Sequence, residues 1–182
     1  MDWDLMLSDL ESSFDAERRA DLVAQSAELA EAEHASIEVV DRLRGSVGRP
    51  VHLRTRGGLP VDGVIARVEP TYVLVDEGEE LQAIVPLAAV AMVMGLAGPA
   101  PRDARRRPAL GALLREIARR GVRVRLVVGT GEVVGRLIRV GADHIDVALD
   151  PEGGVRARRA PGAGGAGVVS VMTAAIEVLR SR

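Results

Sequence analysis

The chain has 182 residues, of which 47% are hydrophobic, and a formal net charge of −2. This length allows one large domain or two small ones with a buried core, whereas the longest apolar runs fall short of the ~20 residues that a membrane-spanning helix needs. Cysteine is absent, which excludes disulfides and thiolate metal sites. The acidic opening "MDWDLMLSDLESSF" lacks the positive start of a secretory signal. We therefore expect a cytoplasmic protein that does not bind membranes.

The small net charge hides a gradient along the chain. Residues 1–45 carry a net charge of −8, residues 46–101 of −2 and residues 102–182 of +8. A basic half can bind nucleic acid or another acidic partner. It can equally receive an acidic segment of its own chain or of a neighbouring chain. The charge pattern leaves both interpretations open.

The first 44 residues are predicted to form an acidic helical segment. They are rich in Ala, Glu, Leu and Arg, and they contain neither Gly nor Pro. Trp3, Leu7, Leu10 and Phe14 follow at spacings of four, three and four, which places them on one face of a helix. A helix cannot bury such a face against itself. We therefore expect it to dock on the rest of the chain or on a partner helix.

Residues 45–96 are predicted to form a small β-structure. Apolar and polar residues alternate from Val51 to Val75, and "RGG", "EPT" and "DEGEE" interrupt this pattern as turns. About five short strands with turns at roughly 8–12-residue spacing are typical of a small antiparallel barrel or sandwich.

The second half of the chain repeats this order after a break. The stretch 97–108, "AGPAPRDARRRP", is rich in Pro, Ala and Arg and is predicted to be a linker. In residues 109–182, "ALGALLREIARRG" is predicted to be a helix that ends at Gly121. Strands follow from "VRVRLVV" to the end of the chain.

The two halves are similar in sequence, which predicts a duplication. At an offset of 72 residues the matching positions are Val61 with Val133, Gly63 with Gly135, Ile65 with Leu137, Val68 with Val140, Val73 with Ile145 and Val75 with Val147. Further on, "PLAAVAMV" (86–93) matches "MTAAIEVL" (172–179) at an offset of 86, because "GGVRARRAPGAGGAG" lengthens one loop of the second copy. The shared order is a short helix followed by five strands, present twice.

Each copy resembles the Sm-like family. A short helix, a strand, a glycine turn and "VxGxI(x)2V" are similar to the family's first motif, and the strand pairs before "GLAG" and ending in "VLRS" are similar to its second. The resemblance covers about 45–95 and 109–181, and the Lys-free, Arg-rich composition is similar to that of proteins from high-GC bacteria. It implies an α+β protein in which the N-terminal helical segment is followed by two five-stranded antiparallel β-barrels of Sm-like or SH3-like type, each preceded by a short helix.

Three positions of the family's motifs carry other residues in whole or in part. The family's Asp is replaced by Glu69 and Gly141, its base-holding Asn by Val73 and Ile145, and its closing Arg-Gly by Met94-Gly95 and Arg180-Ser181. The resemblance therefore implies the fold and leaves most of the family's base pocket without its usual residues.

The sequence predicts neither an enzyme nor a metal or cofactor site. The chain has three histidines: His34 lies in the acidic helical segment, His52 on a predicted strand, and His144 beside Asp143 and Asp146. Alternation along a strand would place these two carboxylates on opposite faces, which leaves too few ligands for zinc. The run "GAGGAG" lacks the Lys-Ser/Thr that follows the glycines of a phosphate-binding loop.

The basic second half is the first candidate for a binding site. Phosphate contacts from arginines would give salt-dependent, largely sequence-independent binding to RNA or other nucleic acid. The candidate residues are Arg119, Arg120, Arg123, Arg125, Arg156, Arg158 and Arg159. Single-strand binders commonly stack bases on aromatic side chains, and the second half has none.

The second candidate is a protein-interaction or assembly surface. The loop after the central strands is acidic in the first copy, with Asp76, Glu77, Glu79 and Glu80, and basic in the second, with Arg156, Arg158 and Arg159. Equivalent loops of opposite charge suit head-to-tail association of unlike halves, within or between chains. The sequence thus predicts a non-enzymatic, regulatory binding protein. Its partner would be nucleic acid, or another protein reached through the N-terminal helix, or a further copy of itself in a homo-oligomer.

Overall fold

The computed structural model describes the backbone of residues 3–101, 108–129, 131–151, 155–156 and 167–181, and the side chains of 12–101, 108–129, 131–151 and 167–181. The chain divides into two compact units, Met1–Glu38 and Val39–Arg182. Each unit is described by itself below.

The first unit is built by one long helix, α1 (Trp3–Ala35). Its described side chains, from residue 12 onward, are all exposed. They include the apolar Phe14, Leu22, Val23 and Leu29. None of the helices in the described part of the chain is long and apolar enough to cross a membrane.

The second unit contains two further helices, α2 (Val39–Gly45) and α3 (Leu110–Arg120). Gly121 ends α3 in the left-handed conformation, at a φ of 62°, as the sequence indicates. The strands are β1 (Pro50–Thr55), β2 (Pro60–Val68), β3 (Tyr72–Gly78), β4 (Leu81–Pro86), β5 (Val90–Met94), β6 (Arg123–Val128), β7 (Gly131–Val140), β8 (His144–Leu149), β9 (Val155–Arg156), β10 (Val168–Met172) and β11 (Ile176–Ser181). Short 3-10 turns, η1 (Leu87–Ala89) and η2 (Thr173–Ala175), precede β5 and β11.

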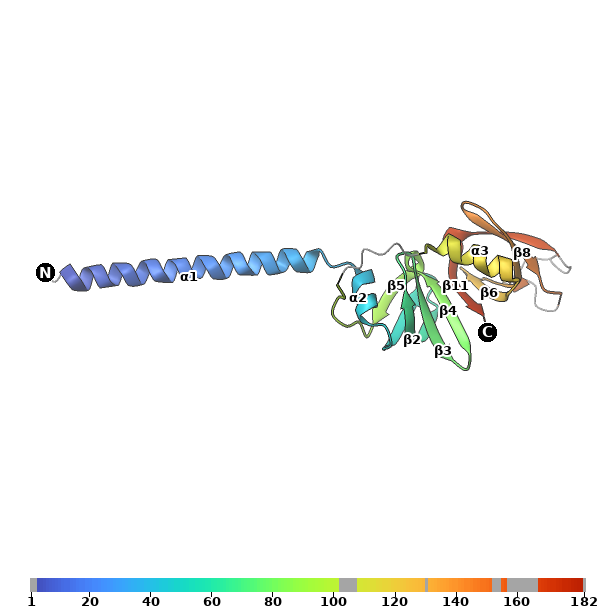
Figure 1. Ribbon diagram of the computed structural model, residues 1–182, viewed down its shortest axis with the longest axis horizontal. Helices are drawn as coiled ribbons and strands as arrows, with labels where there is room; N and C mark the ends of the chain where they lie inside the picture. Colours follow the sequence, from blue (N-terminus) through green and yellow to red (C-terminus); the bar gives the residue numbers. More distant parts are fainter. Residues whose placement is uncertain (1–2, 102–107, 130, 152–154, 157–166, 182) are drawn as a thin grey trace. The chain divides into compact units, whose positions relative to one another are not determined.

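The prediction of two separate five-stranded barrels is wrong. The described strands form one open antiparallel sheet in the order β10-β8-β7-β6-β11-β4-β3-β2-β1-β5, with β9 paired to β7. Figure 1 shows the strands of this sheet, with α3 lying against those of the second half. The overall α+β class is correct.

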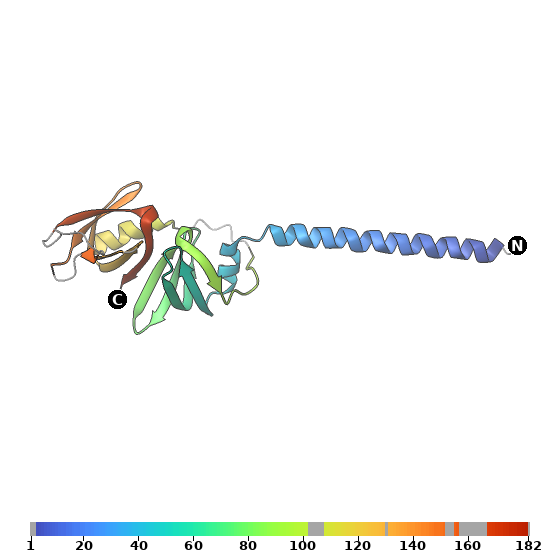
Figure 2. The same ribbon diagram turned by 180° about the vertical axis from the view of Figure 1, so that it is seen from behind.

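The separate barrels fail because the fourth strand of the first half pairs across to the last strand of the second. Leu179 lies opposite Ile84, Arg180 opposite Ala83 and Ser181 opposite Gln82, in antiparallel register. Figure 2 shows the C-terminal strand, drawn in red, beside the green strands of the first half. Backbone pairing therefore continues from one half into the other.

The duplication predicted from the sequence is present in the backbone of the two halves. The pairing of β2 with β3 shifts its register between Ile65 and Arg67. The pairing of β7 with β8 shifts between Leu137 and Arg139, and these positions are related by the offset of 72. η1 and η2 are related by the offset of 86.

A glycine in the middle of β2 and of β7 allows the neighbouring strand to approach closely. A Cβ built on Gly63 would clash with the carbonyl oxygen of Asp76, and one built on Gly135 would clash with that of Ala148. Both strand pairs, β2–β3 and β7–β8, therefore need a residue without a side chain at this point.

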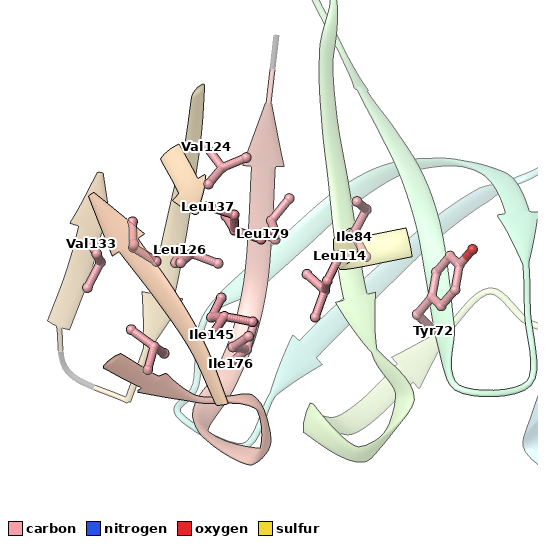
Figure 3. Close-up of a cluster of buried hydrophobic side chains, with 12 residues drawn as sticks. Tyr72, Ile84, Leu114, Val124, Leu126, Val133, Leu137, Ile145, Ile176 and Leu179 are labelled. Atoms are coloured by element: carbon pink, nitrogen blue, oxygen red, sulfur yellow. The ribbon is translucent and has the colours of Figure 1, made fainter. Parts of the chain in front are cut away.

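Each half has its own hydrophobic cluster, and each cluster includes residues of the other half. The second-half cluster contains Leu126, Leu137 and Leu179, and it is joined by Tyr72 and Ile84 of the first half. Figure 3 shows Leu179 and Ile84 on neighbouring strands of this cluster. The first-half cluster is likewise joined by Val178. The two halves therefore fold as one unit.

We predict that Gly63→Ala and Gly135→Ala each destabilise the second unit by about 1–3 kcal/mol, because the added methyl group must displace the backbone of the next strand. The midpoint of urea unfolding measures this loss. Gly111→Ala on α3 is the matched control, because a Cβ there meets only the end of the Arg115 side chain. It should be neutral or stabilising by up to about 1 kcal/mol. Equal losses at all three glycines would contradict the close-approach argument.

Candidate interaction surface

The junction between β4 and β11 is held by an ion pair between the two halves. Arg180 donates from Nε to Glu77 Oε2 at 2.6 Å and from an η nitrogen to Oε1 at 2.8 Å. The two side chains are only 16% and 12% exposed. The hydrogen bonds to Glu77 raise the pKa of Arg180 above its ordinary value. This bidentate geometry fixes the end of β11 on β3 of the first half.

A buried hydrogen bond holds the start of β11. The Thr55 hydroxyl donates to Glu177 Oε2 at 2.6 Å, and it accepts a bond from the Leu59 amide at 3.0 Å. Gly57 lies so close to the Glu177 carboxylate that a side chain at position 57 would collide with it. Glu177 thus ties the last strand of the second half to the β1–β2 turn of the first.

In the described part of the chain the sheet has two end strands, β5 and β10. Among the described strands, β5 is paired only to β1 and β10 only to β8. Their sequences, "VAMVM" and "VVSVM", contain no charged residue and no proline. Native proteins commonly use such residues to keep an edge strand from pairing with another chain.

Both end strands expose apolar side chains. On β5, Met92 and Met94 are 54% and 55% exposed, and on β10, Val168 and Met172 are 61% and 50% exposed. Exposed apolar side chains on a strand with unpaired backbone groups mark a site for strand addition.

The two free edges are the repeat equivalents of the two strands that pair inside the chain. The offset of 86 relates β5 to β11 and β10 to β4. The pairing register of the equivalent strands also agrees. Val93 on β5 lies opposite Leu53 on β1, and its equivalent on β11, Leu179, lies opposite Leu126 on β6. The chain therefore presents, at its two ends, the two kinds of edge that it joins in its middle.

The arginines predicted to bind nucleic acid face carboxylates of the second half where the structure describes their side chains. Arg119 and Arg120 both pair with Glu116, at 2.6 Å each. Arg123 pairs with Asp150, and Arg125 pairs with Glu132 at 2.7 Å. The hydrogen bonds from Arg120 and Arg119 lower the pKa of Glu116. These arginine side chains are 60–76% exposed, so the pairs lie at the surface.

The expanded basic loop falls largely outside the described residues. Arg158 and Arg159 lie there, and only the backbone of Arg156 is described, in β9. The structure therefore does not place the three arginines against the acidic loop.

The acidic loop forms the tight turn between β3 and β4. Asp76 accepts a bond from the Gly78 amide at 2.9 Å, and Glu79 and Glu80 have positive φ angles of 51° and 63°. Glu77 alone of the four predicted acidic residues pairs with an arginine of the second half in the described structure, and that arginine is Arg180.

The described residues show no arrangement typical of a metal site. No group of three or more histidine or acidic side chains converges in the described part of the chain. His52 pairs with Asp62 and His144 with Asp143, each at 2.8 Å on the surface. A hollow beside the junction is lined by Arg123, Arg125 and Arg180, and each of these arginines already has a carboxylate partner.

Comparison with known protein families and with curated protein sequences found no match to this chain.

Of the residues that form the junction, Glu77 was among the predicted acidic residues, whereas its partner Arg180, the buried Glu177 and the two free edges were missed. Arg180 stood out only as part of a motif match and Glu177 not at all, although both lie in the segment that matches β5 at the offset of 86. A signal for the free edges was available in the absence of charge from "VAMVM" and "VVSVM", at strands predicted to be short.

We predict a large coupling between Glu77 and Arg180. In a double-mutant cycle with alanine, their interaction should contribute about 1–3 kcal/mol to the free energy of unfolding, since both side chains are largely buried. The exposed pair Glu116–Arg119 is the control and should contribute less than about 1 kcal/mol. Urea unfolding at one fixed protein concentration measures both. A coupling for Glu77–Arg180 no larger than the control would show that this pair does not hold the junction.

Proposed function

We propose that the chain is a non-enzymatic assembly module that associates head to tail with further copies of itself. The free edge β5 of one copy pairs with the free edge β10 of the next. The observation that supports this most directly is that these strands are the repeat equivalents of β11 and β4, which pair inside every chain.

The internal junction supplies the expected geometry. Leu179 lies opposite Ile84, and Arg180 lies opposite Ala83. The offset of 86 turns these pairs into Val93 opposite Ser170 and Met94 opposite Val169 of the next copy. The contact is heterologous, since each copy contributes a different edge. Such contacts build a ring when the rotation closes and a filament when it does not.

Pairing would remove exposed apolar surface from water. Val178 on β11 is fully buried in the cluster of the first half. Its equivalent on β5 is Met92, which is 54% exposed in the single chain. Fully burying an exposed side chain of this kind contributes about 1.5–3 kcal/mol, and Met92, already partly buried, would contribute roughly half of that.

The partner edge is more polar than its internal counterpart. Ser170 stands at the position of Ile84, and its hydroxyl donates to Asp146 at 2.7 Å. Ile84 is only 7% exposed and belongs to the second-half cluster. We therefore expect the contact between copies to be weaker than the junction inside the chain, and to depend on protein concentration.

The surface charges favour assembly over nucleic-acid binding. A protein that binds nucleic acid places arginines on phosphates and so displaces the counterions that are condensed on the nucleic acid. The described candidate arginines Arg119, Arg120, Arg123 and Arg125 all have carboxylate partners. A nucleic-acid binder would bind single-stranded RNA at low salt and lose it steeply as salt rises, and assembly through apolar edges predicts no such dependence.

We predict that the chain associates in a concentration-dependent way, and that one charge on either edge prevents it. In sedimentation equilibrium, the wild type should exceed its chain mass of 19.3 kDa. Met92→Lys on β5 and Ser170→Lys on β10 should each sediment near the chain mass, because their equivalents in the internal junction, Val178 and Ile84, are buried, so that each lysine would be buried without a partner. Ile138→Lys is the matched control, since Ile138 is 55% exposed but lies on the interior strand β7.

The control variant should associate like the wild type. A wild type that stays at the chain mass at every concentration would refute the proposal, and so would equal association by all three variants.

A further inference from the structure

In a head-to-tail assembly, the strands that pair inside a chain must not exchange with the strands that pair between chains. β5 of one copy could compete with β11 for β4, because the two strands are repeat equivalents. Such an exchange would open the chain's own fold. Selective contacts therefore need chemistry that penalises the wrong partner as well as favouring the right one.

We propose that Met94 and Leu149 form the selective contact between copies, at the position that Arg180 and Glu77 occupy inside the chain. This inference rests on the proposed head-to-tail assembly, and it identifies the residues that decide which edges join.

The repeat places these residues at equivalent points. Met94 lies opposite His52 on β1 as Arg180 lies opposite Arg125 on β6. Glu77 and Leu149 are related by the offset of 72, one residue beyond Asp76 and Ala148, whose carbonyl oxygens approach the equivalent glycines. When β5 of one copy lies on β10 of the next, Met94 therefore takes the place of Arg180 and meets Leu149 in the place of Glu77.

The chemistry of the two contacts is opposite. Arg180 and Glu77 form a largely buried ion pair inside the chain. Met94 is 55% exposed, and Leu149 is half-buried against the second-half cluster. Arg180 therefore suits Glu77 as a partner, and Met94 suits Leu149. Met94 against Glu77, or Arg180 against Leu149, would leave one charge without a partner in a closed junction, and removing one partner of a buried pair is strongly unfavourable.

A second contact follows the same rule. Inside the chain Thr55 donates to the buried carboxylate of Glu177. Thr55 pairs with Val90 on β5, and Val128 pairs with Ile176 on β11, so Val128 is the equivalent of Thr55. The equivalent of Glu177 is the exposed Ala91. Both polar contacts of the internal junction thus become apolar pairs between copies.

The test exchanges the apolar pair for the ion pair. Met94→Arg alone and Leu149→Glu alone should each weaken self-association at least about tenfold, because each leaves one charge unpaired.

An equimolar mixture of the two single variants should recover association. In the mixture, the introduced arginine of one variant can meet the introduced glutamate of the other at one junction, and the native methionine and leucine can meet at the next. The double variant Met94→Arg/Leu149→Glu should also recover it. Sedimentation equilibrium of the full chain measures all four samples.

A second measurement uses position 94 alone, because Leu149 is half-buried and its variant must be checked by its unfolding midpoint. Met94→Leu should associate like the wild type, and Met94→Gln, of similar size, should associate more weakly. Equal association by the Leu and Gln variants would overturn the inference, and so would a folded mixture that does not recover. Both results are distinct from failure of the assembly proposal itself, in which the wild type would not associate.

Discussion

The antiparallel pairing of β4 with β11 is the interaction on which the rest of the structure depends. It joins the two copies of a duplicated segment through backbone hydrogen bonds, so that the described strands form one sheet. It also brings Tyr72 and Ile84 into the cluster of the second half and Val178 into that of the first. Two small sheets of this size would each bury little apolar surface alone. The shared junction adds side chains of each half to the hydrophobic cluster of the other.

The same pairing creates the free ends of the sheet. A duplicated unit that is joined by unlike edges always leaves one edge of each kind unpaired. In this chain those edges are β5 and β10, and both carry exposed methionine or valine side chains without any charge. Such edges are a liability unless a partner covers them. The partner we propose is a further copy of the chain, because the equivalent strands β11 and β4 pair in the middle of each molecule.

Much of the local structure was predictable from the sequence. The alternation from Val51 to Val75 predicts the strands, and the matching positions of Gly63 and Gly135 predict the duplication. In the structure each of these glycines allows a close approach of the next strand that a side chain would block. The arrangement of the strands was not predictable in the same way. Alternation tells which side chains share a face, but it does not tell which strand is the neighbour. For this reason the sequence suggested two closed barrels, whereas β4 pairs with the last strand of the chain.

The interaction surface was missed for a related reason. Arginines and acidic loops attract attention in a sequence, whereas an edge strand is recognisable as free only once its neighbours are known.

The central claim is that β5 of one copy lies on β10 of the next in the register of the internal junction, and disulfide trapping tests it most directly. The chain has no cysteine, so a pair can be introduced cleanly. In that register Met94 lies opposite Val169, and directly opposed residues of antiparallel strands are about 4.5–5.5 Å apart, within reach of a disulfide. Met94→Cys/Val169→Cys should form covalently linked multimers under oxidising conditions. Met94→Cys/Val168→Cys, shifted by one residue to the other face, should form few. Linkage that is absent from the first variant, or equal in the two, would contradict the account.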